Sequence, residues 1–248
     1  MDLLNKTILI TGASDGIGEV LAVEFAKLGS NIILLAKDPE KLDKVYDRLD
    51  HSFDSQKHLI LQDDLNLLNN ESAHEIFRAI TEEYTCLDGI VNNAAILGTM
   101  TTLEDYELSK WDEVLNINLR APFLLTKTLK SILEDSTLPR IIFTSSGVAN
   151  IGRAFWGAYS VSKFGLKGLA EIFANELETT SSIKVFNFDP GATKTKMRSS
   201  ARPAEDPNSI KTPHALIDCY LWFFSEESSN STEKYYEYAY LSRKVTST

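Results

Sequence analysis

Short runs of apolar residues recur along the chain, separated by stretches in which apolar positions repeat every three or four residues. The runs are too short for helices, rich in β-branched residues and apolar at consecutive positions. This pattern is typical of strands that are buried on both faces of a sheet. We therefore predict six strands, over residues 7–11, 31–36, 58–62, 87–93, 140–145 and 183–188.

The stretches between the runs have the spacing of amphipathic helices. In 16–28, for example, Ile17, Leu21 and Phe25 fall on one helix face. The spacing predicts helices over 16–28, 38–49, 71–84, 104–117, 119–134, 160–178 and 213–225. Strands that alternate with helices predict an α/β fold with a doubly wound parallel sheet of six to seven strands and helices on both faces. Residues 196–212, polar and without a period, are expected to form a long loop.

The composition is that of a folded, acidic protein. Hydrophobic residues make up 43% of the chain, and the formal net charge of −10 disfavours a general nucleic-acid or anionic-membrane surface. No apolar run approaches the roughly 20 residues of a membrane span, and the first strand begins too early for a signal or transit peptide. We expect a cytoplasmic protein without a metal site, in which Cys86 and Cys219 are unpaired thiols.

A glycine-rich turn, "TGASDGIG", follows the first predicted strand and leads into the first predicted helix. Gly12, Gly16 and Gly18 in this position allow a tight bend and the close approach of a pyrophosphate to the helix N-terminus. Three glycines would also suit a plain strand–helix turn. Their place in an alternating chain favours a dinucleotide site, and hence a single Rossmann-type domain over residues 1–248.

The residues after the second predicted strand bear on which dinucleotide binds. An acidic residue there favours the ribose 2′-hydroxyl of NAD, and a basic one favours the 2′-phosphate of NADP. The strand is followed by Lys37, a cation, and by Asp38, which would either cap the next helix or bind the ribose. Asp15, within the glycine turn, opposes a nearby phosphate. We predict that NADP(H) is the preferred cofactor, with NAD(H) as the alternative.

Tyr159 and Lys163 are four residues apart at the start of a predicted helix, and so share one face. A nearby ammonium lowers the pKa of a phenol from about 10, which makes the phenol a better general acid at neutral pH. The same spacing is also common on solvated helix faces. Ser146, after the fifth predicted strand, lies at the sheet edge where α/β proteins bind ligands, and its hydroxyl would hydrogen-bond a substrate carbonyl.

The motifs "TGASDGIG", "NNAA" (92–95), Ser146 and "YSVSK" (159–163), in this order and spacing, resemble the classical short-chain dehydrogenase/reductases. The resemblance covers about residues 4–225. The downstream segment "DPGATKTKMR…EDP…KTP" looks most like the bacterial YciK-type branch of that family. The resemblance implies a Rossmann-type fold, a nicotinamide cofactor and hydride transfer to or from a small molecule.

Four residues match the family's catalytic positions. Tyr159 would donate or accept the proton, and Lys163 would lower its pKa and bind the nicotinamide ribose. Ser146 would hold the substrate carbonyl, and Asn118 would interrupt its helix and hold a water in the proton relay. Cofactor contacts are implied for Gly12, Ser14, Asp15, Gly16, Ile17, Gly18, Lys37, Asp64, Leu65, Asn93, Tyr159, Lys163, Thr193 and Thr195.

Three features depart from the family pattern. Ala95 in "NNAA" stands where glycine is usual, and Asp15 replaces a basic residue that is common in NADP-preferring members. The C-terminal segment "STEKYYEYAYLSRKVTST" lacks the usual "DGG" ending of the seventh strand, for which "YYEYAYL" is a candidate substitute.

The loop over residues 196–212 is expected to meet the substrate. Substrate contacts are predicted for Ser146, Phe155, Trp156 and Met197. Phe155 and Trp156 would either wall an apolar pocket or fill core. Four basic residues would either be solvated or attract an anionic substrate: Lys194, Lys196, Arg198 and Arg202.

Together these features predict an NAD(P)-dependent oxidoreductase, either a carbonyl reductase or an alcohol dehydrogenase, that transfers a hydride between NADP(H) and a carbonyl or alcohol, with Tyr159 as general acid/base. The alternative is a non-catalytic NAD(P)-binding regulatory protein on the same fold. An epimerase or dehydratase would need a longer C-terminal substrate domain. The family also implies a homodimer or homotetramer through helices 104–134 and 160–178.

Overall fold

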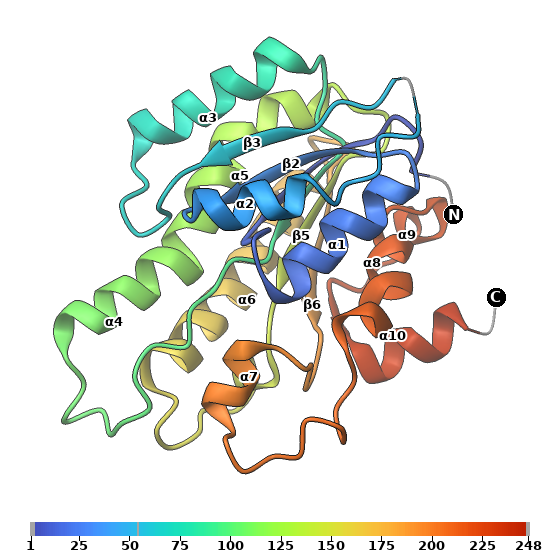
Figure 1. Ribbon diagram of the computed structural model, residues 1–248. Coiled ribbons are helices and arrows are strands. Elements are labelled where there is room, and N and C mark those ends of the chain that lie inside the picture. The colour runs from blue at the N-terminus through green and yellow to red at the C-terminus, as the bar shows by residue number, and fades with distance from the viewer. Residues whose placement is uncertain (1–2, 54, 247–248) are drawn as a thin grey trace.

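The computed structural model describes residues 3–53 and 55–246, and its centre is a seven-stranded parallel sheet in the order β3-β2-β1-β4-β5-β6-β7 (Figure 1). The strands are β1 Thr7–Thr11, β2 Asn31–Ala36, β3 Leu59–Gln62, β4 Gly89–Asn92, β5 Arg140–Thr144, β6 Lys184–Asp189 and β7 Tyr235–Glu237. The six predicted strands are confirmed, although β3 and β4 are shorter than expected.

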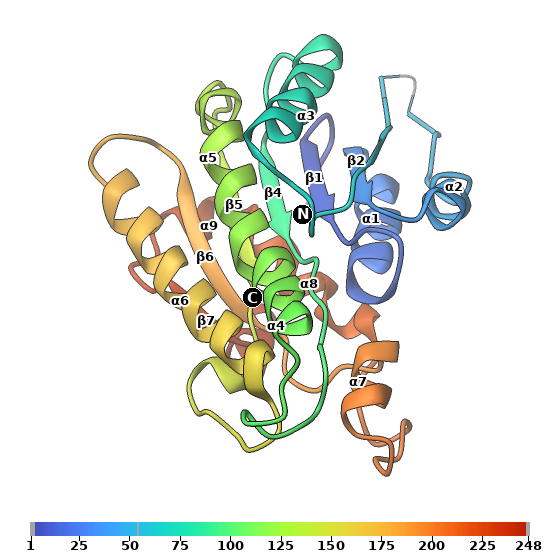
Figure 2. The ribbon, with the colours of Figure 1, turned by 90° about the vertical axis from the view of Figure 1, so that its left-hand side faces the viewer.

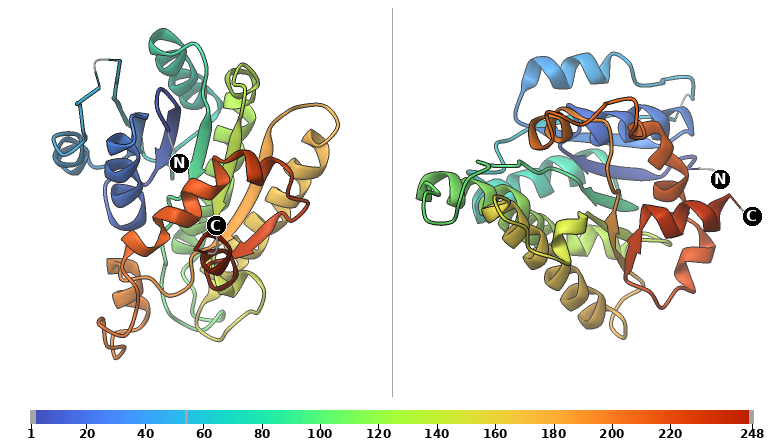
Figure 3. Two further views of the ribbon diagram at one scale, coloured as in Figure 1. Left: turned by 90° about the vertical axis from the view of Figure 1, so that its right-hand side faces the viewer. Right: turned by 90° about the horizontal axis from the view of Figure 1, so that it is seen from below.

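Helices cover both faces of the sheet. Figure 2 shows α4, α5 and α6 in front of one face, and the left view of Figure 3 shows α8 crossing the other. The helical segments are α1 Gly16–Lys27, α2 Pro39–Tyr46, α3 Asn70–Glu83, α4 Leu108–Leu115, η1 Asn116–Arg120, α5 Ala121–Glu134, η2 Gly147–Ala149, α6 Gly157–Leu177, α7 Lys196–Ala201, η3 Pro213–Leu216, α8 Ile217–Phe223, α9 Glu226–Ser229 and α10 Tyr238–Val245. Among residues 3–53 and 55–246, no helix is both long enough and apolar enough to cross a membrane.

The central strands are apolar at consecutive positions because they contribute to two cores. In β1, Ile8 and Ile10 pack with α1, α2 and α8, whereas Leu9 packs on the opposite face with α3, α5 and α6. Successive side chains of a strand point to opposite faces, so both faces of this sheet must be covered. The doubly wound architecture predicted from the sequence is confirmed.

The C-terminal segment does supply a seventh strand, but a short one. Tyr235 pairs with Asn187 of β6, and the chain turns into α10 only three residues later. Tyr236 is buried, with its ring 6.0 Å from that of Phe186 and 5.1 Å from that of Trp222. This aromatic cluster explains why the strand forms without the usual "DGG" sequence.

The segment 196–212 is more ordered than its sequence indicated. It begins with helix α7, which Thr195 caps by accepting a hydrogen bond from Arg198 N at 3.2 Å. The base of the segment is closed by a bridge between Thr193 and Lys211. The expectation of a purely irregular loop was therefore wrong for its first six residues.

Candidate active site

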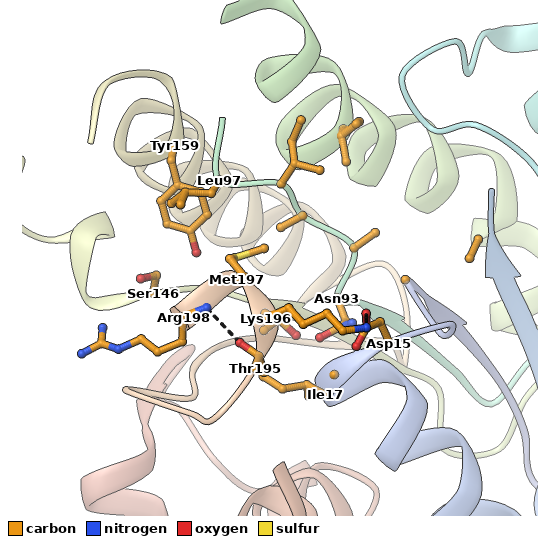
Figure 4. Close-up of a pocket in the computed structure, with 18 of the residues that line it drawn as sticks. Asp15, Ile17, Asn93, Leu97, Ser146, Tyr159, Thr195, Lys196, Met197 and Arg198 are labelled. Carbon is orange, nitrogen blue, oxygen red and sulfur yellow. Dashed lines mark hydrogen bonds and ion pairs between the residues drawn. The ribbon is translucent and has the colours of Figure 1, made fainter. Parts of the chain in front are cut away.

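A cavity of about 450 Å³ lies where the carboxyl ends of β1, β2, β4, β5 and β6 meet (Figure 4). This is the edge at which α/β sheets bind ligands. Most of the predicted site residues line it: Gly12, Ser14, Asp15, Gly16, Ile17, Lys37, Asp64, Leu65, Asn93, Ser146, Trp156, Tyr159, Lys163, Thr193, Thr195 and Met197. Of the other predicted residues, Gly18, Asn118 and Phe155 lie outside its lining.

The glycine turn packs so closely that two of its glycines have no room for a side chain. Gly12 has a φ of +64°, and a Cβ there would lie 2.9 Å from the Cα of Ala94. A Cβ on Gly18 would lie 2.3 Å from the carbonyl oxygen of Gly12. Gly18 therefore serves the packing of α1 against the turn, which leaves the N-terminus of α1 facing the cavity.

Lysines flank the end of the cavity near β2. Lys37 Nζ lies 3.6 Å from the carboxylate of Asp64, and Lys41 also lines the cavity. Asp38 caps α2 by accepting a hydrogen bond from Lys41 N at 3.2 Å, and this hydrogen bond lowers the pKa of its carboxyl. Asp38 was expected either to cap this helix or to bind the ribose, and in the structure it caps the helix.

The predicted catalytic residues come together at the other end of the cavity. Tyr159 and Lys163 lie in the first two turns of α6, and Ser146 lies just after β5. Ser146 lies close enough to Tyr159 to affect the pKa of its phenol, and Figure 4 shows the phenol oxygen directed into the cavity. Lys163 Nζ lies 5.7 Å from the centroid of the Tyr159 ring and donates a hydrogen bond to the Thr144 carbonyl oxygen at 2.7 Å.

Burial dominates the electrostatics of this pair. It raises the pKa of Tyr159 to about 12, against the opposing effect of the neighbouring Ser146 hydroxyl. Burial also lowers the pKa of Lys163 to about 8, because a buried ammonium loses its hydration. The structure thus does not show the lowered tyrosine pKa that the sequence predicted, since desolvation of the phenolate outweighs the opposing effect of Ser146.

Asn118 interrupts its helix, as the family resemblance implies. It lies in η1, a π-helical segment between α4 and α5, and such wide turns are frequent at functional sites. Its Oδ1 accepts a hydrogen bond from Ile96 N at 2.8 Å, and its Nδ2 donates to the Ile96 carbonyl oxygen at 2.9 Å and to Ser162 Oγ at 3.1 Å. These contacts hold the chain after β4 against α6.

Trp156 and Met197 line the cavity beside the catalytic residues, together with Leu97 and Ala95. The rings of Trp156 and Tyr159 lie 5.8 Å apart. Phe155 neither walls the pocket nor fills core, because the residue is 54% exposed and lies outside the cavity lining. Its φ of 71° turns the chain so that Trp156, not Phe155, faces the site.

The chain after β6 closes over the glycine turn. The Cγ2 atom of Thr195 lies 3.4 Å from where a Cβ of Gly16 would be, so the two segments are in contact. Lys196 Nζ lies 2.7 Å from the Asp15 carboxylate, across the cavity (Figure 4). Asp15 therefore has a cationic partner, which the sequence did not reveal because the two residues are 181 positions apart.

Asp189 is a site residue that the sequence reasoning missed. It ends β6, lines the cavity and is 7% exposed, and its Oδ1 accepts a hydrogen bond from Gly191 N at 2.8 Å. Burial raises the pKa of its carboxyl, and the nearby Lys211 and Lys163 oppose that change. An acid at the carboxyl end of an otherwise apolar strand was the signal that could have identified it.

The cavity fits a nicotinamide dinucleotide. Gly12 and Gly16 line the cavity beside the N-terminus of α1, which suits a pyrophosphate. At the catalytic end, Ser145 Oγ is buried, lines the cavity and has no hydrogen-bond partner among the described residues. A buried hydroxyl without a partner is costly unless a ligand satisfies it.

Comparison with known proteins agrees with this geometry. The family model of short chain dehydrogenase matches residues 6–206. The chain is 37% identical over 232 residues to the uncharacterized oxidoreductase YciK of Escherichia coli, covering 93% of this chain and 91% of that protein. It is 29% identical to an NADPH-dependent pterin aldehyde reductase of Arabidopsis thaliana, covering 79% and 78%.

Among solved structures, a short chain dehydrogenase of Escherichia coli CFT073 complexed with NADPH has a TM-score of 0.90 at 36% identity, over 96% of this chain and 98% of that one. The fold, the motifs that line the cavity and these similarities all indicate the same family. The chain belongs to the short-chain dehydrogenase/reductase family of oxidoreductases, and within it is of the YciK type.

Proposed function

We propose that the protein is an NADP(H)-dependent carbonyl reductase or alcohol dehydrogenase in which Tyr159 is the general acid and base. The main support is that Ser146 and Tyr159 line the same cavity with the Ser146 hydroxyl acting on the phenol, and that the glycine turn lines the other end of this cavity. A protein that only binds a nucleotide has no need of a phenol and a serine held together at that point.

The proton belongs to Tyr159 in the direction of reduction. Because the pKa of its phenol is raised to about 12, the residue is protonated at neutral pH and can donate to a carbonyl oxygen. A bound nicotinamide dinucleotide supplies the hydride that the carbonyl carbon receives. Ser146 holds the carbonyl oxygen by hydrogen bonding, and Tyr159 transfers its proton to the same oxygen as negative charge develops there.

Lys163 and Asn118 position this chemistry. Lys163 is anchored to the Thr144 carbonyl oxygen at the end of β5, which places its ammonium at the catalytic end of the cavity, where it would bind the nicotinamide ribose. Asn118 holds the segment after β4 against α6. We propose that this contact maintains the distance between the cofactor side and the tyrosine side of the cavity.

The preference for NADP(H) rests on the charges near β2. Lys37 and Lys41 line the cavity there, and the carboxylate of Asp38 is engaged with Lys41 in the helix cap. A 2′-phosphate would thus meet two lysines, each of which now lies beside a carboxylate, Lys37 beside Asp64 and Lys41 beside Asp38. The NADPH complex of a structural neighbour agrees with this preference.

A fluorescence titration with NADPH and NADH in parallel tests the cofactor assignment. NADPH is expected to bind at least about tenfold more tightly, a difference of about 1.4 kcal/mol in binding free energy. Tighter binding of NADH would reject the preference and reassign Asp38 as the ribose ligand. If neither cofactor binds, the oxidoreductase proposal fails.

A panel of aldehydes and ketones then tests the reaction. Tyr159→Phe is expected to lower the rate of NADPH oxidation by at least about 100-fold, while NADPH still binds. Tyr240→Phe, at an exposed tyrosine of α10, is the matched control. Tight binding of NADPH with no turnover across a broad panel would favour the non-catalytic alternative.

A further inference from the structure

A second hollow adjoins the catalytic end of the site. Its volume is about 690 Å³, and it lies between the segment after β5 and the segment after α7. Ser146, Trp156, Asp189 and Arg198 line both this hollow and the main cavity. A molecule whose carbonyl reaches Ser146 can therefore extend into the hollow without leaving the site.

Three arginines line this hollow: Arg153, Arg198 and Arg202. Arg198 is neutralised, because its Nε lies 2.6 Å from Glu205 Oε2 and its Nη2 contacts Oε1 of the same carboxylate. In the part of the chain that the structure describes, no ion pair joins Arg153 or Arg202 to a carboxylate. Among the described residues these two guanidinium groups are thus not held in ion pairs, and Arg202 acts on the Glu205 carboxylate only from a longer distance.

Arg202 is held in a defined place relative to the catalytic tyrosine. Its guanidinium carbon lies 5.7 Å from the centroid of the Trp156 ring, and that ring lies 5.8 Å from the ring of Tyr159. A cation–π contact of this length restrains the position of the guanidinium while leaving its N–H groups free to donate. The Trp156 ring therefore lies between the Arg202 guanidinium and Tyr159, the proposed proton donor to the carbonyl.

We propose that the protein acts on carbonyl compounds that also carry a carboxylate, which Arg202 binds in the hollow with support from Arg153. The inference rests on the proposed function, since it assigns the carbonyl to Ser146 and Tyr159. The guanidinium fork matches a carboxylate in two parallel hydrogen bonds. A phosphate dianion fits less well, because Glu205 and Asp189 line the same hollow and would repel the second charge.

Binding of a matched pair of aldehydes tests this inference directly. The probes are 4-formylbenzoate and its methyl ester, which differ in charge but have the same carbonyl. With NADP⁺ present, isothermal titration calorimetry on the wild-type protein is expected to give at least about tenfold tighter binding of the acid. Arg202→Gln should abolish that preference, and Arg202→Lys should retain part of it, because the charge remains while the fork is lost.

Arg78→Gln is the matched control. Arg78 is an exposed arginine of α3 whose contact with Glu75 is 3.9 Å long, and its loss should leave the preference for the acid unchanged. Equal binding of acid and ester by the wild-type protein, or an unchanged preference in Arg202→Gln, would overturn the inference.

Turnover of the same two aldehydes with NADPH separates this inference from the proposed function. Reduction of both compounds with equal affinity would leave the reductase proposal standing and reject the carboxylate site. Selective binding of the acid that Arg202→Gln abolishes, without reduction of any carbonyl in the panel, would support the site and reject the reductase.

Discussion

Replacing Gly18 with alanine is expected to destabilise the protein and to weaken cofactor binding together. Gly18 is in the first turn of α1, where a Cβ would lie 2.3 Å from the Gly12 carbonyl oxygen and 2.8 Å from Asn93 Nδ2. The first of these atoms is backbone, so it cannot move aside without shifting the glycine turn. An ordinary contact begins near 3.4 Å, which requires a displacement of about 1 Å.

The size of the effect follows from two opposing contributions. Overpacking costs about 1 to 3 kcal/mol, and a backbone clash belongs at the upper end of that range. Alanine recovers about 1 kcal/mol relative to glycine within a helix. The free energy of unfolding should therefore fall by about 2 kcal/mol, which corresponds to a lowering of Tm by about 4 to 8 °C in a protein of this size.

Chemical denaturation and an NADPH titration measure the two consequences. Gly168→Ala is the control, because Gly168 lies inside α6 and a Cβ there would meet nothing within 4 Å. This variant should be as stable as the wild type or more stable by up to about 1 kcal/mol. If Gly18→Ala matches Gly168→Ala in both stability and NADPH affinity, the packing account of the turn is refuted.

The charged groups and the exposed face of the helices give three further expected outcomes. Because burial lowers the pKa of Lys163 from 10.5 to about 8, the unfolded chain binds more protons between these values and stability rises with pH. From pH 7.5 to 9.5 the free energy of unfolding should rise by about 2 kcal/mol more in the wild type than in Lys163→Met; parallel urea curves would contradict this. Lys196→Ala leaves the Asp15 carboxylate without its partner at 2.7 Å and should weaken NADPH binding several-fold by fluorescence titration, whereas the double variant with Asp15→Asn should recover it. Equal NADPH affinity of Lys196→Ala and the double variant would contradict the electrostatic explanation. Ile172 and Phe164 of α6 are 56% and 44% exposed, and we propose that this face forms a homodimer or homotetramer. Sedimentation should give an oligomer that Ile172→Glu dissociates, and a wild-type monomer at micromolar concentration would reject the proposal.

Much of the site could be predicted because its residues belong to short motifs next to the ends of strands and helices. Each of these motifs follows a strand or begins a helix: the glycine turn, Ser146 and the Tyr159–Lys163 pair. In a parallel sheet these positions lie at one edge, so the residues line the same cavity. The spacing of Tyr159 and Lys163 on α6 needed only helix geometry.

Other features depend on contacts between distant segments. The pKa of Tyr159 is raised and not lowered, because the surrounding packing removes water from the phenol. Asp15 and Lys196 pair although they are far apart in sequence. Trp156 faces the site and Phe155 is exposed because the φ of Phe155 is positive. A phenylalanine does not indicate a positive φ, so nothing in the sequence indicated this turn.

The amino-acid sequence by itself determined the alternation of strands and helices, the parallel sheet with two buried faces and the identity of the residues at its carboxyl edge. These depend on periodicity, chain direction and the conformational demands of glycine, which act within a few residues. The tertiary structure alone decided the length of the seventh strand, the burial of Asp189 and the placing of Arg202 on Trp156 beside Tyr159. Burial and the distances between charges are properties of the packed chain, because desolvation and Coulomb energies depend on which segments meet in space.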